Sequence, residues 1–197
     1  MKETFEERET IELVRKAKSG DDAAFTRLVK KYEQVVFSFA FKVCRDKNKA
    51  AETLQDTFIN VYRKLDQFDG RSKFTTWLYS IVVRNCLMKN RRKKIEFETI
   101  SIDHAVEDDG DDRAVRPVVA VHDTPLTGIM KKELKEMLAS AIQRLSVDYR
   151  IVFILRDMEG QTAEETAAIL KLSVPAVKSR LRRARIFLRN ELEAYMR

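Results

Sequence analysis

The chain has 197 residues and a net charge of +7, with 44% hydrophobic and 35% charged residues. Only 5 Gly and 3 Pro are present, which favours helices over a turn-rich fold, and the length suits one large or two small domains. No apolar run reaches the length of a membrane span, and the N-terminus lacks the apolar segment of a signal peptide. We therefore expect a cytoplasmic protein, without membrane insertion, that binds an acidic partner.

The first 95 residues carry apolar side chains at helical spacing, and we expect a first domain over 1–95. Gly20 is placed to end one helix, and Asp21 to cap the next. Apolar residues then recur in steps of three and four, the period of a helix with one buried face, along 25–43, 54–65 and 74–81. No stretch alternates as a strand would. The pattern predicts an all-α fold.

Aromatic and basic residues are mixed between 67 and 94, and the stretch ends in a run of cations. Single-stranded nucleic acid uses both kinds of side chain, because bases stack on rings and phosphates pair with cations. Trp77 shares a face with apolar neighbours and is more simply explained as a core residue. Phe68, in a loop beside Gly70, is harder to place in a core.

Residues 96–125 differ in composition from the rest of the chain. They hold nine acids and two bases, two of the three prolines and no helical period. This is typical of a flexible linker, and an acidic linker is by default merely solvated. Since the linker is acidic, the remainder of the chain is more basic than the overall charge indicates. Both histidines, His104 and His122, fall within it.

The remaining residues, 126–197, predict a second helical domain that contains a helix-turn-helix. Thr162 and Glu165 have the spacing of a capping box, and Ser173 is placed to cap the following helix. That helix has an apolar stripe at Val177, Leu181, Ala184 and Leu188. Six basic residues and no acid occur from 178 to 189, which favours a helix that reads DNA. A solvated helix at the edge of a bundle is the alternative, although such a helix would mix both signs of charge.

The sequence predicts neither a catalytic centre nor a cofactor or metal site. Cys44 and Cys86 fall in apolar helical patterns and are expected to be buried small hydrophobes in a reducing compartment. A redox-sensing pair is the alternative, without local support. There is no carboxylate pair, cysteine cluster or glycine-rich phosphate loop, so an enzyme acting on nucleic acid is a weak rival.

Three motifs resemble the extracytoplasmic-function (ECF) sigma factors of bacterial RNA polymerase. The first is ETLQDTF at 52–58, the second is FDGRSKFTTWLY at 68–79, and the third runs from LSVDYR at 145–150 to VKSRL at 177–181. The resemblance covers almost the whole chain except its first residues and most of the linker. It implies two helical domains, called sigma-two and sigma-four, joined by an acidic linker that threads the active-site cleft and RNA exit path of the polymerase.

The resemblance implies core RNA polymerase and promoter DNA as partners. Sigma-two binds the clamp helices of the largest subunit and opens the minus-ten element, while sigma-four meets the flap of the second-largest subunit and the minus-thirty-five element. The polymerase contacts would be Glu52, Gln55 and Asp56. The minus-ten contacts would be Phe68, Arg71, Ser72, Lys73, Trp77, Arg84, Asn85, Lys89, Arg91 and Arg92. The minus-thirty-five contacts would be Lys178, Ser179, Arg180, Arg182, Arg183 and Arg185.

Members of this family are commonly held by a cognate anti-sigma factor, and the sequence does not identify one. Four positions depart from the family pattern. Ala51 and Thr53 replace an acidic and a branched apolar residue in the polymerase-binding helix, Arg84 stands where Asn is common, and Lys171 stands where the turn often has Gly. A helix-turn-helix regulator that acts without polymerase is the alternative function, but it does not explain Phe68 or the cations at 89–94.

Overall fold

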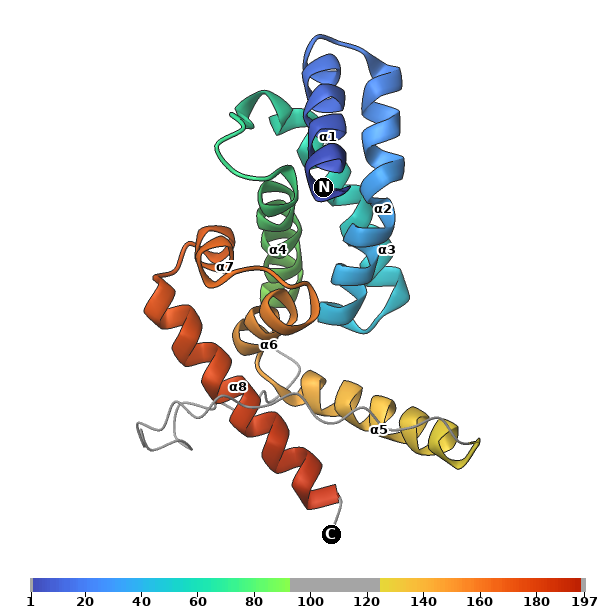
Figure 1. Ribbon diagram of the computed structural model, residues 1–197, viewed down its shortest axis with the longest axis vertical. Coiled ribbons are helices and arrows are strands. Elements are labelled where there is room, and N and C mark those ends of the chain that lie inside the picture. The colour runs from blue at the N-terminus through green and yellow to red at the C-terminus, as the bar shows by residue number, and fades with distance from the viewer. Residues whose placement is uncertain (1, 93–124, 196–197) are drawn as a thin grey trace.

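The computed structural model describes residues 2–92 and 125–195 as helices joined by short turns, with no strand in those ranges (Figure 1). The all-α prediction is therefore confirmed. The first domain contains α1 (Lys2–Lys18), α2 (Asp22–Cys44), α3 (Lys47–Lys64), η1 (Leu65–Gln67) and α4 (Phe74–Arg92). The second contains α5 (Pro125–Arg144), α6 (Val147–Phe153), η3 (Ile154–Met158), α7 (Ala163–Leu170) and α8 (Val174–Tyr195). The predicted linker lies outside the described residues except for Pro125, which begins α5.

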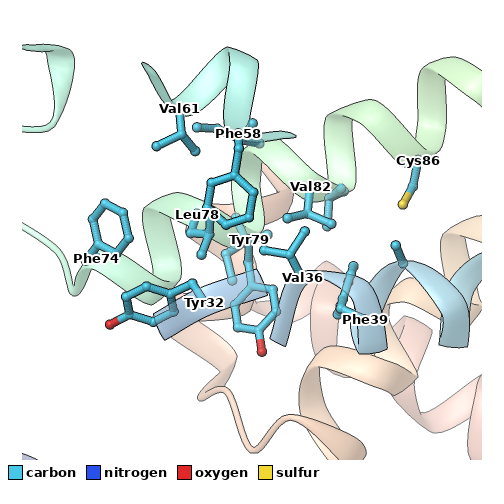
Figure 2. Packing of buried hydrophobic residues seen from close by; sticks show 14 of the residues in the cluster. Tyr32, Val36, Phe39, Phe58, Val61, Phe74, Leu78, Tyr79, Val82 and Cys86 are labelled. Carbon is cyan, nitrogen blue, oxygen red and sulfur yellow. The ribbon is translucent and has the colours of Figure 1, made fainter. Parts of the chain in front are cut away.

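Helices α1 to α4 form a bundle whose core is built from the predicted apolar faces. Asp21 caps α2 by accepting a hydrogen bond from the backbone amide of Ala24 at 3.0 Å. Large side chains that are almost fully buried fill the space between the helices, among them Val36, Phe39, Val61, Leu78 and Val82 (Figure 2). Phe68 belongs to this core, with 5% of its surface exposed. The expectation that Phe68 is hard to place in a core was wrong.

The second domain is smaller and is organised by the apolar stripe of α8. All four predicted stripe residues are buried: Val177, Leu181, Ala184 and Leu188. They divide between two clusters, one against α5 and α6 and one against α6 and α7. Each cluster is small, so α8 acts as the common support of the domain.

The two domains pack against each other rather than lying apart. Ile151, Ile154, Leu155 and Ile169 of the second domain are buried within the core cluster of the first. Figure 1 shows α7 beside α4, with α6 below the end of that helix. This contact could not be predicted from the sequence, because it depends on surfaces that are distant in the chain.

Candidate nucleic-acid interface

The helix-turn-helix forms as the sequence predicts. Thr162 and Glu165 make a reciprocal capping box that begins α7, with distances of 3.0 Å and 2.8 Å. The turn then passes through Lys171, whose φ of 55° is left-handed. Ser173 caps the start of α8 and accepts a hydrogen bond from the amide of Ala176 at 3.3 Å. Since the apolar stripe of α8 is buried, the basic face of the helix is fixed toward the outside.

The basic residues of α8 differ in how they are held. Lys178 and Ser179 are exposed, whereas Arg180 and Arg182 are half-buried. Arg183 is also half-buried, and its Nη1 donates to the hydroxyl of Tyr149 at 3.5 Å. The first half of the predicted DNA-facing set is therefore the more accessible half.

Arg185 is engaged within the domain. It makes a bidentate ion pair with Asp157 of η3, with distances of 2.9 Å and 2.6 Å. Hydrogen bonding to Asp157 raises the pKa of Arg185, although burial opposes the shift. A phosphate would have to compete with this carboxylate for the guanidinium.

A cleft of about 550 Å³ lies between α3 and α4 in the first domain. Its lining combines cationic, apolar and amide side chains from both helices with one carboxylate, that of Asp56. The cations are Arg63, Lys64, Arg84 and Lys89, and the apolar residues are Ile59 and Met88, which are 50% and 55% exposed. The sequence predicted Arg84, Asn85 and Lys89 as DNA contacts but not the α3 side of the cleft, because the lateral packing of two helices is not visible in either pattern alone.

The wall of the cleft is fixed by a chain of hydrogen bonds. The amide of Asn60 donates to Asn85 Oδ1 at 3.2 Å, and Asn85 Nδ2 donates to Thr57 Oγ1 at 3.1 Å. Thr57 in turn donates to the backbone carbonyl of Thr53 at 2.6 Å. Asn85 is 7% exposed, so its amide is positioned and not free to rotate. Thr53 is fully buried, so its side chain is not available to a protein that binds the polar face of α3.

Lys89 connects the predicted DNA-binding residues with the predicted polymerase-binding residues. Its ammonium lies 2.9 Å from Asp56 and 3.3 Å from Glu52, two predicted polymerase contacts. Burial lowers the pKa of Lys89, but hydrogen bonds to Asp56 and Glu52 outweigh it and raise the pKa overall. Gln55 is exposed on the same helix. One ion-pair cluster therefore connects the acidic face of α3 with the cleft.

The loop before α4 carries exposed polar residues next to a cluster of packed aromatic side chains. The ring of Phe68 packs against Phe74 and Trp77, with centroids 5.5 Å apart in both pairs. These rings mainly support the fold, although Trp77 remains half-buried. The predicted contacts Arg71, Ser72 and Lys73 are exposed. Arg91 and Arg92 end α4, and their side chains lie outside the described part of the chain.

Two acidic residues of the second domain bind the first domain, and neither contact was predicted from the sequence. Glu159 accepts hydrogen bonds from Lys42 Nζ at 2.6 Å and from Tyr79 Oη at 2.7 Å. Burial, and then the adjacent carboxylate, raise the pKa of Tyr79 well above its usual range. Glu165, which closes the capping box, also pairs with Lys73 at 3.2 Å. A residue of the helix-turn-helix therefore touches the loop predicted to meet the minus-ten element.

Arg150 is a third contact between the domains. Its guanidinium donates to three carbonyls at the end of α5, those of Ile142, Gln143 and Leu145, and to the carbonyl of Val43 near the end of α2, the last at 2.8 Å. Helix C-termini carry unpaired carbonyls and a partial negative charge, so one cation stabilises two helix ends.

The described ranges contain neither a candidate metal site nor a candidate membrane span. Among those residues no three His, Cys, Asp or Glu side chains lie close enough to hold a metal ion, and no helix is long and apolar enough to cross a membrane. His104 and His122 lie outside the described residues.

Two family models match the chain, one in each domain. The model of Sigma-70 region 2 matches residues 28–95, and the model of Sigma-70 region 4 matches residues 135–188. The RNA polymerase sigma-H factor of Pseudomonas aeruginosa is 30% identical over 189 residues, 94% of this chain and 95% of that protein. The ECF RNA polymerase sigma-E factor of Haemophilus influenzae is 31% identical over 187 residues, 93% of this chain and 95% of that protein.

Solved structures agree with these matches. The structure of CnrH in complex with the cytosolic domain of CnrY has a TM-score of 0.63 at 26% identity and covers 92% of this chain and 96% of that chain. RpoE of Bartonella quintana, in complex with the anti-sigma factor NepR, shares the fold, with a TM-score of 0.61 at 24% identity over 86% of this chain and 96% of that chain. Sigma factors are in general not enzymes. With a region 2 domain, a region 4 domain and full-length relatives, the chain belongs to the ECF RNA polymerase sigma factors, transcription initiation factors that direct core polymerase to promoters.

Proposed function

We propose that the cleft between α3 and α4 holds the separated strand of the minus-ten element, while the basic face of α8 reads the minus-thirty-five element. The observation that carries this proposal is the make-up of the cleft. Four cations and one carboxylate, Asp56, line the cleft together with the exposed apolar residues Ile59 and Met88 and the fixed amide of Asn85. Duplex binding needs the cations alone, whereas an unpaired base also needs apolar and hydrogen-bonding contacts.

The energy available in such a cleft is comparable to the cost of opening a base step. Base stacking on a protein side chain contributes about 1–3 kcal/mol, and flipping a base costs a few kcal/mol. Arg84 is exposed in the cleft and can approach a phosphate or stack on a base. The Asn85 amide already takes part in hydrogen bonds with Asn60 and Thr57, so only its remaining donor and acceptor positions can bind a base. Arg84 is therefore the better candidate for the decisive contact.

On α8, Lys178 and Arg182 are four residues apart and share one side of the helix. Lysine and arginine recognise guanine acceptors in the major groove, and each good bidentate contact contributes about 1–3 kcal/mol of discrimination. Lys178 and Ser179 are the exposed pair, so we assign base contacts to this end of the helix. We assign Arg185 to phosphate contact, in which a phosphate would take the place of the Asp157 carboxylate.

Binding both elements requires the two domains to separate. The elements are named for positions about 25 base pairs apart, which is about 85 Å of duplex. In the structure Glu165 of α7 lies 3.2 Å from Lys73 in the first domain, so parts of both proposed sites are adjacent. Residues 93–124 could span about 105 Å if fully extended, which is sufficient for the separation.

The remaining partners follow from the acidic face of α3 and from the relatives. Glu52, Gln55 and Asp56 would meet the clamp helices of the polymerase, and the second domain would meet the flap. Because RpoE of Bartonella quintana was solved with the anti-sigma factor NepR, we also propose an anti-sigma partner for this chain. The protein would work in the bacterial cytoplasm without catalytic activity or a cofactor of its own.

Strand opening by the reconstituted holoenzyme tests the proposal. Permanganate footprinting on a promoter selected by run-off transcription should reveal unpaired thymines with the unmodified chain and about tenfold fewer with Arg84→Ala. Arg8, exposed on α1 away from the cleft, provides the control variant Arg8→Ala, which should open the promoter normally. Equal promoter opening by both variants would show that the cleft does not take part in strand opening. Failure of the unmodified chain to bind core polymerase without DNA would instead favour a polymerase-independent regulator.

A further inference from the structure

One lysine of α4 is held by two carboxylates of α3. Lys89 Nζ donates a hydrogen bond to Glu52 Oε2 at 3.3 Å and lies 2.9 Å from Asp56 Oδ2. Glu52 and Asp56 are four residues apart, so their side chains lie on the same side of α3. These two side chains are 65% and 49% exposed, whereas that of Lys89 is 24% exposed. An incoming protein therefore reaches the carboxylates before it reaches the ammonium.

The same lysine also belongs to the cleft between α3 and α4. Lys89 and Asp56 both line this cleft, whereas Glu52 stands outside it. A lysine ammonium is carried on a flexible four-carbon stem, so it can turn from the carboxylates toward the cleft without any movement of the helix. While Lys89 stays paired, its charge is neutralised and the Asp56 carboxylate repels a DNA phosphate from this wall. The cleft of the free chain therefore lacks one of the cations that its sequence provides.

We propose that Glu52 and Asp56 withhold Lys89 from DNA in the free chain, and that a cationic protein surface bound to these carboxylates releases Lys89 to a DNA phosphate in the cleft. This inference rests on the proposed function, in which the acidic face of α3 binds polymerase and the cleft binds the minus-ten strand. The cationic surface then belongs to polymerase. Polymerase binding and strand binding are coupled through one side chain that both partners compete to rearrange.

The release follows from charge and needs no change in the fold. A second cation placed on the two carboxylates repels the ammonium of Lys89, and a phosphate in the cleft replaces the partners that Lys89 loses. The effect is reciprocal by linkage. A phosphate that draws Lys89 into the cleft leaves Glu52 and Asp56 without their cation, and this strengthens their attraction for a cationic partner. Polymerase and the minus-ten strand therefore bind the chain with positive cooperativity.

An ion pair that merely fastens α3 to α4 is the alternative. The two helices are already held by the core that contains Val61 and Val82. Asn85 of α4 adds hydrogen bonds to two side chains of α3. An ion pair with exposed carboxylates contributes little beside such packing. The two interpretations also predict different results, because a fastening role leaves DNA binding unchanged when a carboxylate is removed, whereas release of Lys89 strengthens it.

The first test measures DNA binding by the free chain, with fluorescein-labelled single-stranded oligo-dT as the probe, because a phosphate contact does not depend on sequence. Asp56→Asn should tighten binding about tenfold at fixed low salt. Loss of a negative charge strengthens DNA binding by itself, so the same substitution is made beside Lys89→Gln, where we expect about twofold. The difference of about fivefold is the size of one exposed ion pair. Glu33→Gln, which removes an exposed carboxylate of α2 outside the cleft, should change binding by less than about twofold.

The salt dependence of the same binding reaction counts phosphate contacts. Each contact with a single strand adds about 0.7 to the slope of log affinity against log salt concentration. Asp56→Asn should steepen this slope by about 0.7 when Lys89 is present and should leave it unchanged beside Lys89→Gln. If Asp56→Asn has the same effect on affinity and slope in both backgrounds, Lys89 is not the cation released and the proposal is wrong.

The second test uses the unmodified chain and therefore does not depend on how the variants fold. The free chain and its complex with core polymerase are treated briefly with an acetylating reagent, and the acetylation of each lysine is measured by mass spectrometry. Lys89 should react severalfold faster in the complex and slowly again when promoter DNA is added. Lys64, which lines the same cleft, should be protected by DNA but should not react faster with polymerase alone.

An acetylation rate of Lys89 that is unchanged or lower in the complex would overturn the proposal. Failure to form any complex with core polymerase would instead refute the proposed function. In that case the affinity measurements on the free chain still decide whether Asp56 withholds Lys89 from DNA, so the two failures are distinguishable.

Discussion

Replacing Glu159 with alanine should open the contact between the two domains. Glu159 is 14% exposed at its side chain and holds two groups of the first domain, the ammonium of Lys42 and the hydroxyl of Tyr79. In an open form all three side chains return to water. The loss of these hydrogen bonds therefore destabilises the closed form and leaves the stability of the open form unchanged.

The magnitude can be worked from the two contacts. Leaving the buried Tyr79 hydroxyl unpaired costs about 1–3 kcal/mol. Lys42 is 29% exposed, so the loss of its ion pair costs at most about 1 kcal/mol. We expect about 3 kcal/mol in total, which shifts the ratio of closed to open molecules about a hundredfold toward the open form. Glu159→Gln keeps an acceptor for Tyr79 and should lose about 1 kcal/mol only.

Small-angle X-ray scattering measures the outcome as a radius of gyration. We expect an increase for Glu159→Ala, a smaller one for Glu159→Gln, and none for Glu164→Ala, which removes an exposed carboxylate from α7. Circular dichroism should show unchanged helix content in all three. If Glu159→Ala scatters like the unmodified chain, the buried contacts of Ile154, Leu155 and Ile169 alone hold the domains together and our assignment of Glu159 is wrong.

Three further substitutions test individual features. Lys171→Gly should raise the free energy of unfolding by about 1 kcal/mol in urea denaturation, because the turn residue is left-handed; an unchanged or lower midpoint would mean that no strain is stored there. Thr53→Val should stabilise the chain by about 1 kcal/mol, since the Thr53 hydroxyl is buried and has no hydrogen-bond partner among the described residues; destabilisation in the same assay would reveal a partner. Arg182→Ala should weaken binding to promoter DNA by about 1–3 kcal/mol and affect scrambled DNA much less, as measured by fluorescence anisotropy at fixed salt; equal losses on both DNAs would make Arg182 a phosphate contact.

The sequence by itself determined the helices, their caps and the family. Helical periodicity and capping are local properties, so the box of Thr162 and Glu165 and the buried stripe of α8 were predicted correctly. The motif order also predicted a region 2 domain followed by a region 4 domain. The site residues named from the sequence remain predictions.

Only the tertiary structure decided which side chains meet across the chain. Packing placed Phe68 in the core, paired Lys89 with the acidic face of α3, and brought Glu159 to Tyr79. None of these contacts has a signature in a local pattern, because each joins residues that are distant in sequence or belong to different elements. Their partners are fixed by how buried faces fit together, and this fit is a property of the whole fold.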